Sequence, residues 1–478
     1  MRLRLAQHCT LLDSDLETPV GMFIRLVGDR QGILLESAET DGRWGRYSII
    51  ASDFLLSVVC RDGLLEVRSA DKRLASLSAH SGKAFSEGLR ALLRSLAVTG
   101  DPENPQPPIT RAFYGYLGYG MAGILEKKLA SVLPAAEAEA SLALPGSLLV
   151  FDHGYNRITR ITLLLEGEPL ESLPDLPPAG TGKDLPGQSS AFGETDPAGP
   201  AARIRPARTE GKAGYLAAVA RVKEMLHQGE GIQVVLSTPF SAPLVEKPFN
   251  LYRRLRRMNP SPYMFYMSLP DGALLGSSPE VLVSCSANRL TLCPIAGTRP
   301  RGQDPAADAF FGDELLQDPK EKAEHVMLVD LGRNDLGRIA KAGSVRLDRF
   351  MELEKFSHVM HLTSRISADL APGLDALDVA AATFPAGTVS GAPKIRAMEI
   401  IAQEEDAPRG PYAGAVGWLG LDADAVHLDF GIIIRSLWVR AGRVHWQAGA
   451  GIVHDSEPER EWLECLAKAE VIRQSVLQ

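Results

Sequence analysis

Two groups of acidic residues stand at helical spacing in the second half of the chain. Glu461, Glu464 and Lys468 follow one another at intervals of three and four residues, so they share one face of a helix predicted over residues 456–474. A second predicted helix, DPKEKAEHVMLVD, carries Glu321 and Glu324 beside apolar positions. Carboxylates on two helices can hold one Mg²⁺, which takes few protein ligands and completes its octahedron with water and ligand oxygens. A solvated helix face with a surface ion pair is the alternative that the spacing leaves open.

Glycine-rich segments and one arginine accompany these acids. The segments CPIAGTRPRG and QAGAGIV lie at predicted strand ends, where backbone N–H groups can receive an anion. Arg435 ends an apolar predicted strand, and its guanidinium is suited to a two-point grip on a carboxylate. Together these features predict a site for a small carboxylated anion beside a metal ion. Residue spacing identifies the anion no further.

Strands follow strands over most of the chain, as in RYSIIASDFLLSVVC, GALLGSSPEVLVSC and DAVHLDFGIIIRSLWV. Helices are predicted over residues 319–331, 374–382, 393–403 and 456–474. This order favours large antiparallel sheets flanked by helices over a doubly wound parallel sheet. Residues 169–206 contain eight prolines, which is typical of a linker or surface loop. We therefore predict an N-terminal region (1–166), a linker or loop (167–208) and a catalytic region (209–478).

Composition narrows the classes of partner. The 478-residue chain has a net charge of −8. A negative field repels phosphate backbones and anionic lipids, so neither nucleic acid nor a membrane is an expected partner. The sequence has no apolar stretch long enough to span a bilayer, and the N-terminus has no signal-peptide core. The five scattered cysteines do not form a disulfide or zinc pattern, so a cytoplasmic location is the simplest expectation.

Two short motifs carry little functional weight. Gly118, Gly120 and Gly123 spell GxGxxG, a dinucleotide fingerprint when it lies in a βαβ unit. No repeated βαβ pattern surrounds these glycines, so we interpret them as residues that permit close turns. His358 and His361 form HxxH, which is a poor metal pair on spacing alone.

The sequence resembles the chorismate-utilising enzymes through motifs that cover almost all of residues 213–478. In chain order these are GIQVVLS, NPSPYMFYM, GSSPE, PIAGTRPRG, EHVMLVDLGRNDLGR, HVMHLTS, FPAGTVSGAPKIRAMEI, PYAGAVGWLG, IIIRS and QAGAGIV. The N-terminal TPV, LLES and RYSII segments match more sparsely. The resemblance implies an α/β (α+β) fold of two large, orthogonally packed antiparallel sheets flanked by helices, with the active site between the sheets.

The resemblance also implies a set of site residues. Glu324 and Glu464 would bind Mg²⁺, and Glu461 would be an outer, water-mediated partner. The metal would hold the ring carboxylate of chorismate. The other implied substrate contacts are Gly297 and Thr298 along the ring, Arg435 and the backbone of Gly449, Ala450 and Gly451 at the carboxylates, and Lys468 as nearby positive charge.

Two further residues match catalytic positions of the family. Glu280 of GSSPE would be the general acid beside the departing 4-hydroxyl group. Partial burial near other acids would raise its pKa and keep it protonated for that task. His361 of VMHL would assist the elimination of pyruvate, which makes the ring aromatic. A buried histidine bonded to backbone is the alternative interpretation of His361.

Two positions distinguish among the reactions of the family. Aminodeoxychorismate synthases have a nucleophilic lysine where this chain has Ala296. Isochorismate and salicylate synthases have a lysine base where this chain has Gln233, which takes no proton at neutral pH. Both differences favour ammonia as nucleophile, with anthranilate and pyruvate as products, in tryptophan biosynthesis. An enzyme that stops at 2-amino-2-deoxyisochorismate and a tryptophan-binding subunit without turnover are the alternatives.

Partners and regulation are implied in the same way. Family members obtain ammonia from a glutamine amidotransferase, and no cysteine of this chain has a nucleophile-elbow context, so a separate subunit in a hetero-oligomer is expected. In the family, LLES and NPSPYM form a pocket in which tryptophan inhibits the enzyme. The residues that would line it here are Glu36, Ser37, Asn259, Pro262, Tyr263 and Met264. A packing contact between sheets, with no ligand, is the alternative.

Overall fold

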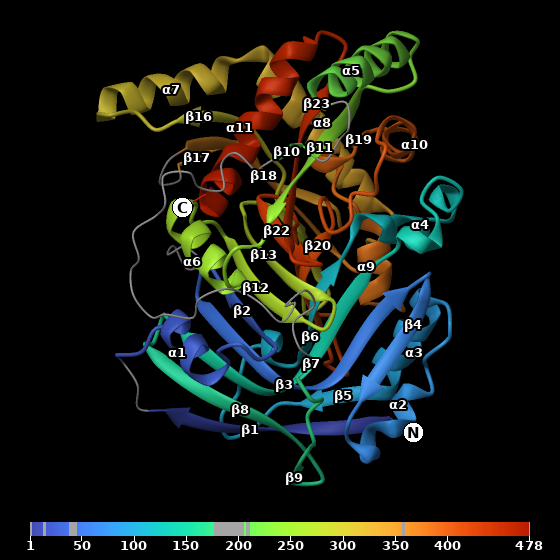
Figure 1. The fold of residues 1–478 in the computed structure, drawn as a ribbon, viewed down its shortest axis with the longest axis vertical. Coiled ribbons are helices and arrows are strands. Elements are labelled where there is room, and N and C mark those ends of the chain that lie inside the picture. Colours follow the sequence, from blue (N-terminus) through green and yellow to red (C-terminus); the bar gives the residue numbers. More distant parts are fainter. Residues whose placement is uncertain are drawn as a thin grey trace.

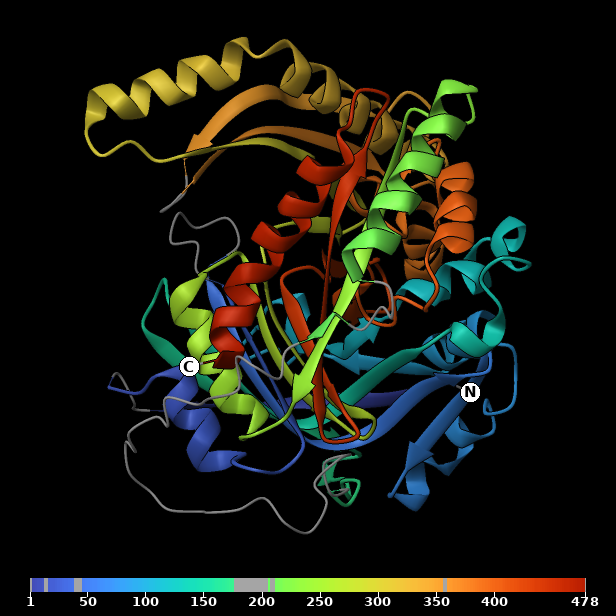
Figure 2. The same cartoon turned by 45° about the horizontal axis from the view of Figure 1, so that its top comes forward.

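A computed structural model describes residues 2–12, 16–37, 45–175, 205–206, 211–355 and 359–477 of the chain. Most of the predicted linker, residues 176–204 and 207–210, lies outside the described residues, as does His358. The described part is a mixed α/β structure in which helices lie outside a strongly curved set of strands (Figures 1 and 2). In that part of the chain, none of the helices is both long and apolar enough to cross a membrane.

Eleven helices of α type are described. They are α1 (Pro19–Leu26), α2 (Ala75–Ser78), α3 (Phe85–Ser95), α4 (Ala122–Leu125), α5 (Gly211–His227), α6 (Pro248–Met258), α7 (Pro305–Gln317), α8 (Pro319–Gly337), α9 (Ala376–Thr383), α10 (Lys394–Glu404) and α11 (Pro458–Leu477).

The strands divide at the predicted linker. Those before it are β1 (Leu3–Leu12), β2 (Gly32–Glu36), β3 (Tyr47–Arg61), β4 (Leu64–Ser69), β5 (Leu96–Thr99), β6 (Ala112–Leu117), β7 (Ala140–Asp152) and β8 (Arg157–Leu165), and β9 (Glu168–Pro169) lies at its start. Those within or after it are β10 (Arg205–Pro206), β11 (Gln233–Pro243), β12 (Tyr263–Leu269), β13 (Gly272–Ser278), β14 (Val281–Ser286), β15 (Arg289–Leu292), β16 (Ile295–Pro300), β17 (Arg346–Lys355), β18 (Val359–Asp369), β19 (Gly391–Ala392), β20 (Ala415–Gly420), β21 (Leu428–Ile432), β22 (Ser436–Arg440) and β23 (Arg443–Ile452).

The strands form one hydrogen-bonded ladder with two arms. The first arm runs β2–β12–β13–β22–β23–β11. The second runs β6–β20–β21–β14–β15–β18, and β18 also pairs with β16 and β17. Strands β3 and β7 join the arms, because β3 pairs with β2 and β7 pairs with β6. Among the described strands only β1 and β5 pair in parallel, which confirms the predicted fold class of antiparallel sheets flanked by helices.

The joining strands come from the N-terminal region. Strand β7 has thirteen residues, and the twelve that precede Asp152 are apolar, small or hydroxylated. Nearly all of them are buried, so both faces of β7 are covered. The β3–β7 pairing shifts register between Phe54 and Leu56, which marks a β-bulge that bends β3. Residues 1–166 therefore hydrogen-bond directly to strands of residues 209–478, while the predicted division into regions stays a prediction.

Helix positions agree with the sequence prediction better than helix ends do. The predicted 319–331, 374–382 and 393–403 correspond to α8, α9 and α10. A Ser456–Glu459 capping box predicts that the last helix begins at residue 456, but α11 begins at Pro458. The Ser456 hydroxyl instead accepts a hydrogen bond from the Val453 N–H at 3.0 Å, which closes the turn before the helix.

The GxGxxG glycines have the packing role that the sequence suggests. A Cβ atom on Gly120 would lie 2.3 Å from the Glu137 carbonyl oxygen, and one on Gly123 would lie 2.1 Å from that of Leu133. These glycines therefore allow two backbone segments to approach closely.

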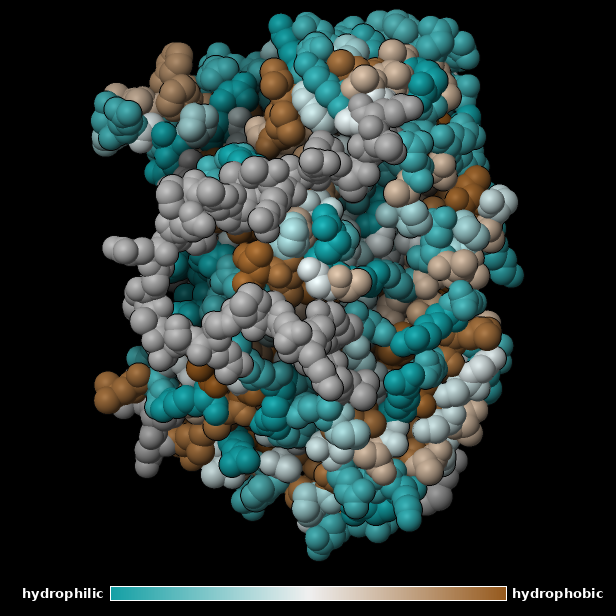
Figure 3. Space-filling view, in the orientation of Figure 1, coloured by the Kyte–Doolittle hydropathy of each residue, from teal (hydrophilic) through white to brown (hydrophobic). Residues whose placement is uncertain are grey.

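On the face shown in Figure 3, hydrophobic side chains of the described residues form small separate patches among hydrophilic ones.

Candidate active site

A cavity of about 290 Å³ lies between the two arms of the ladder. Strands β11 and β23 supply one wall, β16 and β18 supply the opposite wall, and helices α8 and α11 contribute acidic side chains. The cavity brings together most of the site residues that the sequence predicts. Those that line it are Glu280, Thr298, Glu324, His361, Arg435, Gly449, Gly451, Glu461, Glu464 and Lys468.

The predicted metal ligands lie on different helices at this cavity. Glu324 of α8 accepts a hydrogen bond from the Gln233 side-chain amide at 3.4 Å. Glu464 of α11 pairs with Lys468 at 2.7 Å, which is the i,i+4 ion pair of the solvated-face alternative. Lys468 Nζ also donates to the Gly449 carbonyl at 3.2 Å, so this ion pair lies against strand β23 inside the cavity.

The donor set suits a cation that needs few protein ligands. Within the described ranges, no cluster of three or more His, Cys, Asp or Glu side chains is close enough to hold a metal. Glu324 and Glu464 offer only oxygen donors, and both face a cavity with room for water and a ligand. That combination fits Mg²⁺, which commonly binds one or two carboxylates and completes its coordination with water and ligand oxygens.

Glu461 is buried beside the other acids of the cavity. Burial raises its pKa above the ordinary value, and the charge of Glu464 adds to the increase. The Ser456 hydroxyl and the positive charges of Lys320 and Lys468 oppose it. Since Lys320 begins α8, its influence on Glu461 indicates that the start of α8 faces α11 across the cavity.

Glu280 follows β13 and has the properties of a general acid. Burial raises the pKa of its carboxyl group to about 7, although the Thr388 hydroxyl and the charges of Lys468 and Arg435 oppose the increase. A large part of the Glu280 population is therefore protonated at neutral pH. This agrees with the raised pKa expected from the sequence, with burial as the main cause.

The guanidinium of Arg435 has no ion-pair partner within 4 Å among the described residues. Arg435 lies between β21 and β22 with φ of +48°. Its backbone carbonyl accepts a hydrogen bond from the Ser277 N–H at 3.2 Å, but its guanidinium makes no hydrogen bond or ion pair with the described residues. Burial lowers the pKa of its guanidinium, while the nearby Glu280 opposes the decrease. An unpaired guanidinium at the wall of a cavity binds a carboxylate strongly. Burial takes away the water molecules that would accept its hydrogen bonds, and the two carboxylate oxygens of a ligand replace them.

A hydrogen bond to the backbone holds the imidazole ring of His361 in place. Its Nδ1 lies 2.9 Å from the Gly297 carbonyl oxygen and 3.1 Å from the Thr298 hydroxyl. Donation from Nδ1 to a carbonyl selects the tautomer whose Nε2 carries no proton, and burial lowers the pKa of the ring. The histidine is both bonded to backbone, as the alternative interpretation expects, and part of the cavity wall.

Strand β23 presents glycines to the cavity for steric reasons. A Cβ on Gly451 would lie 2.6 Å from Gln233 Nε2, and one on Gly449 would lie 3.0 Å from the Tyr412 hydroxyl. Ala450, between them, points to the other face and packs in the core with Val234 and Leu236, so it does not line the cavity. Gly297 is likewise one residue away from the lining and contributes its carbonyl group.

The two positions that distinguish the reactions both line the cavity. Ala296 lies on β16 and Gln233 on β11, in opposite walls. A lysine at either position would therefore reach the ligand space. Because this chain has no lysine at either position, neither position offers an amine to a ligand in the cavity.

Four polar lining residues were missed by the sequence interpretation: Lys320, Thr388, Tyr412 and Gln447. Lys320 precedes Glu324 by four residues, so helical spacing alone could have placed both on one face. Gln447 lies on β23 two residues before Gly449, so strand alternation could have placed it on the same face. Thr388 comes from a short 3-10 helix and Tyr412 from a turn, and only the packing of distant segments brings these two to the cavity.

A second cavity, of about 90 Å³, contains most of the predicted tryptophan residues. Glu36, Ser37, Pro262, Tyr263 and Met264 line it, because β2 pairs with β12 and places Glu36 opposite Met264. Strands β20 and β21 of the second arm supply the facing residues Trp418 and Asp429, which the sequence interpretation missed.

Three of the residues predicted for this pocket form hydrogen bonds within the protein. The Glu36 carboxylate accepts hydrogen bonds from the Tyr252 hydroxyl at 2.6 Å and from Arg256 Nε at 2.8 Å. Asn259 does not line the cavity, and its side chain donates to the Ser277 carbonyl at 3.3 Å. Tyr263 donates to Asp429 at 2.6 Å across the two arms.

The chain belongs to the family of chorismate binding enzymes, whose model matches residues 58–474. It is 41% identical to anthranilate synthase component 1 of Streptomyces coelicolor over 98% of this chain and 88% of that protein. It is 38% identical to aminodeoxychorismate synthase component 1 of Bacillus subtilis over 91% of this chain and 90% of that protein. The crystal structure of anthranilate synthase component I from Streptococcus pneumoniae TIGR4 matches with a TM-score of 0.67 and 29% identity, covering 97% of this chain and 98% of that one.

Proposed function

We propose that the chain is anthranilate synthase component I, which converts chorismate and ammonia to anthranilate and pyruvate. The observation that carries the proposal is the composition of the cavity. It contains a buried acid with a pKa of about 7, an unpaired guanidinium and two metal-competent carboxylates, but no lysine at Ala296 or Gln233. The full-length relatives that carry this name support the same reaction.

The first step adds ammonia to the ring and expels the 4-hydroxyl group. Arg435 would bind a carboxylate of chorismate and orient the ring against β23. Glu280 would donate its proton to the departing hydroxyl, which leaves as water while the C–N bond forms. With no nucleophile at Ala296, the external amine itself must attack.

The second step removes a ring proton and breaks the bond between the ring carbon and the enolpyruvyl oxygen, so that the ring becomes aromatic and the enolate of pyruvate leaves. The enolate takes up a proton at its methylene carbon to become pyruvate. The unprotonated Nε2 of His361 is a suitable acceptor for the ring proton, because Nδ1 is held by the Gly297 carbonyl. Aromatisation drives this step.

Glu324 and Glu464 would hold Mg²⁺, and Glu461 would contact it through water. When bound, the ion supplies charge stabilisation for the substrate carboxylate and a template that fixes its orientation. Lys468 would keep Glu464 in place through their ion pair.

The partners follow from the same proposal. Ammonia would come from a glutamine amidotransferase subunit, in a hetero-oligomer. All five cysteines are free thiols, which supports a reducing, cytoplasmic compartment. Tryptophan would inhibit by binding at the second cavity, between Tyr263 of the first arm and Trp418 of the second.

The test incubates the chain with chorismate, MgCl₂ and ammonium chloride. Fluorescent anthranilate with one equivalent of pyruvate is expected. An amino-diene without pyruvate would replace the proposal by a 2-amino-2-deoxyisochorismate synthase, and tryptophan binding without chorismate consumption would indicate a regulatory subunit. Formation of 4-amino-4-deoxychorismate would refute the interpretation of Ala296.

The regulatory part has a separate test. We expect tryptophan to quench or shift Trp418 fluorescence and to inhibit the wild type, whereas Trp418→Leu should lose both effects while its activity without tryptophan remains. The conservative Trp418→Phe variant should retain inhibition. Unchanged inhibition in Trp418→Leu would place tryptophan elsewhere.

A further inference from the structure

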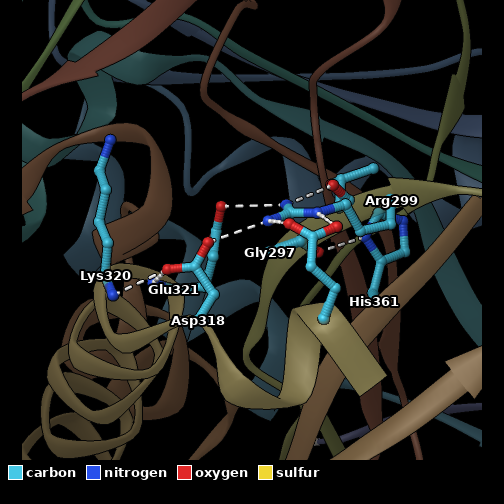
Figure 4. Close-up of polar contacts among 8 residues, drawn as sticks. Gly297, Arg299, Asp318, Lys320, Glu321 and His361 are labelled. Atoms are coloured by element: carbon cyan, nitrogen blue, oxygen red, sulfur yellow. Dashed lines mark hydrogen bonds and ion pairs between the residues drawn. The ribbon is translucent and has the colours of Figure 1, made fainter. Parts of the chain in front are cut away.

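Arg299 lies on β16 beside the active-site cavity but does not line it. Its guanidinium contacts three carboxylates, one from α7, one from α8 and one from Asp318 between the two helices (Figure 4). Nε and Nη2 each lie 3.1 Å from an oxygen of Glu314, near the end of α7. Nη2 also lies 2.9 Å from Asp318, and Nη1 lies 3.5 Å from Glu321. Arg299 therefore links a strand of the second arm to the junction between α7 and α8.

The contact with Asp318 fixes the start of α8. One oxygen of Asp318 accepts hydrogen bonds from the backbone N–H groups of Lys320 at 2.9 Å and Glu321 at 3.3 Å, which caps the helix. Its other oxygen accepts from Arg299. The same carboxylate thus defines the first turn of α8 and ties that turn to β16. Glu324 is on the next turn of this helix.

The contact of Arg299 with Glu321 connects it to His361 through Gly297. A Cβ atom on Gly297 would lie only 3.2 Å from Glu321 Oε2, so this carboxylate lies directly against Gly297. Gly297 has φ of +67° and sits where the β16–β18 register shifts, between Ala296 and Thr298. That bulge turns the Gly297 carbonyl toward Nδ1 of His361, 2.9 Å away.

We propose that Arg299 is a positioning residue that fixes α8 against the β16 bulge and so orients both Glu324 and His361. The proposal rests on the proposed function, because it assigns to Arg299 the task of holding a metal ligand and a proton acceptor in one arrangement. A lysine cannot replace it, because an ammonium group lacks the planar fork that reaches Glu314, Asp318 and Glu321 together.

The first experiment compares Arg299→Lys and Asp318→Asn with Arg333→Lys. Asp318→Asn keeps a side-chain oxygen for the helix cap but weakens the tie to Arg299. Arg333 lies further along α8 and pairs with Asp330 on the exposed surface, so it is the matched control. Partners that orient metal ligands typically change metal affinity or activity by about 10- to 100-fold. We expect the Mg²⁺ concentration for half-maximal activity to rise about 10-fold in both test variants, and to stay unchanged in the control.

The second readout needs no turnover. In ¹⁵N-histidine NMR spectra, with His361 assigned by comparison with His361→Gln, the wild type should show the Nδ1–H tautomer. In Arg299→Lys and Asp318→Asn the His361 nitrogen shifts should move toward a mixture of tautomers, while those of the control stay at wild-type values. Adding Asp318→Asn to Arg299→Lys should cause little further change in the His361 shifts, because both substitutions weaken the same contact between Arg299 and Asp318.

Unchanged His361 shifts in both test variants, or a wild-type Mg²⁺ requirement in both, would overturn the proposal. A wild type that turns over no chorismate would overturn the proposed function instead. The NMR comparison would then still test whether Arg299 positions His361.

Discussion

Replacing Glu280 by glutamine tests the general acid through both activity and stability. Burial raises the pKa of Glu280 from an ordinary 4.5 to about 7 in the folded chain. The folded state thus favours the protonated form, so the stability that this group contributes is fully present below pH 4.5 and is lost as the pH rises through 7. The loss amounts to about 3 kcal/mol at high pH. Glutamine resembles the protonated acid and has no charge to lose.

The stability assay is urea denaturation at pH 5 and pH 8.5. At pH 5 the variant and the wild type should have similar free energies of unfolding. At pH 8.5 Glu280→Gln should be the more stable protein, by up to about 3 kcal/mol. Glu459→Gln, an exposed residue of α11 that pairs with Lys212, is the matched control and should show no such pH-dependent gain.

Activity should change in the opposite direction. A glutamine cannot donate a proton to the departing hydroxyl, so kcat should fall about 100-fold or more. In the wild type, kcat/KM should decline above pH 7 as free Glu280 loses its proton. A variant with near-normal kcat, or a stability difference that is the same at pH 5 and 8.5, would refute the assignment of Glu280 as a buried acid.

Four other substitutions test the rest of the site. Glu324→Gln and Glu464→Gln should each abolish Mg²⁺-dependent turnover, whereas Glu459→Gln should not; near-normal activity with an unchanged Mg²⁺ requirement would refute the ligand assignment. Arg435→Lys keeps the charge but not the fork, so the KM for chorismate should rise about 10- to 100-fold, as expected for loss of a charged hydrogen bond; an unchanged KM would mean that Arg435 faces no substrate carboxylate. Ala296→Lys should slow ammonium-dependent anthranilate formation and give a covalent adduct detectable by mass spectrometry; an unchanged rate and product profile would contradict its placement in the cavity.

The sequence predicted the parts of the site that repeat at regular spacing or lie in motifs. Glu461, Glu464 and Lys468 do share a face of α11, and Glu324 does face the same cavity from α8. Helical periodicity is local, so it can be recognised without knowing the fold. It could not distinguish a ligand from a surface pair, and the structure shows why: Glu464 and Lys468 are an ion pair and also line the cavity.

The contacts that the sequence did not predict are those that depend on distant pairing. Thr388 and Tyr412 reach the cavity only through the packing of segments that are distant in the chain. The partners of Glu36 were missed in the same way, since Tyr252 and Arg256 are more than 200 residues away in the chain. Local patterns contain no information on such long-range partners. The link from Arg299 to His361 likewise passes through a bulge that no spacing rule marks.

The bulge in β3 has a geometric consequence for the whole enzyme. The first arm attaches to β3 at residues 49–51, and the second is attached through β7 residues 140–143, which pair with β3 residues 57–60. The irregularity between Phe54 and Leu56 falls between these two attachment points, so β3 bends on the path from one arm to the other. Among the described strands no other pairing bridges the arms. The N-terminal strands thus join the two walls of the cavity, although none of their described residues lines it.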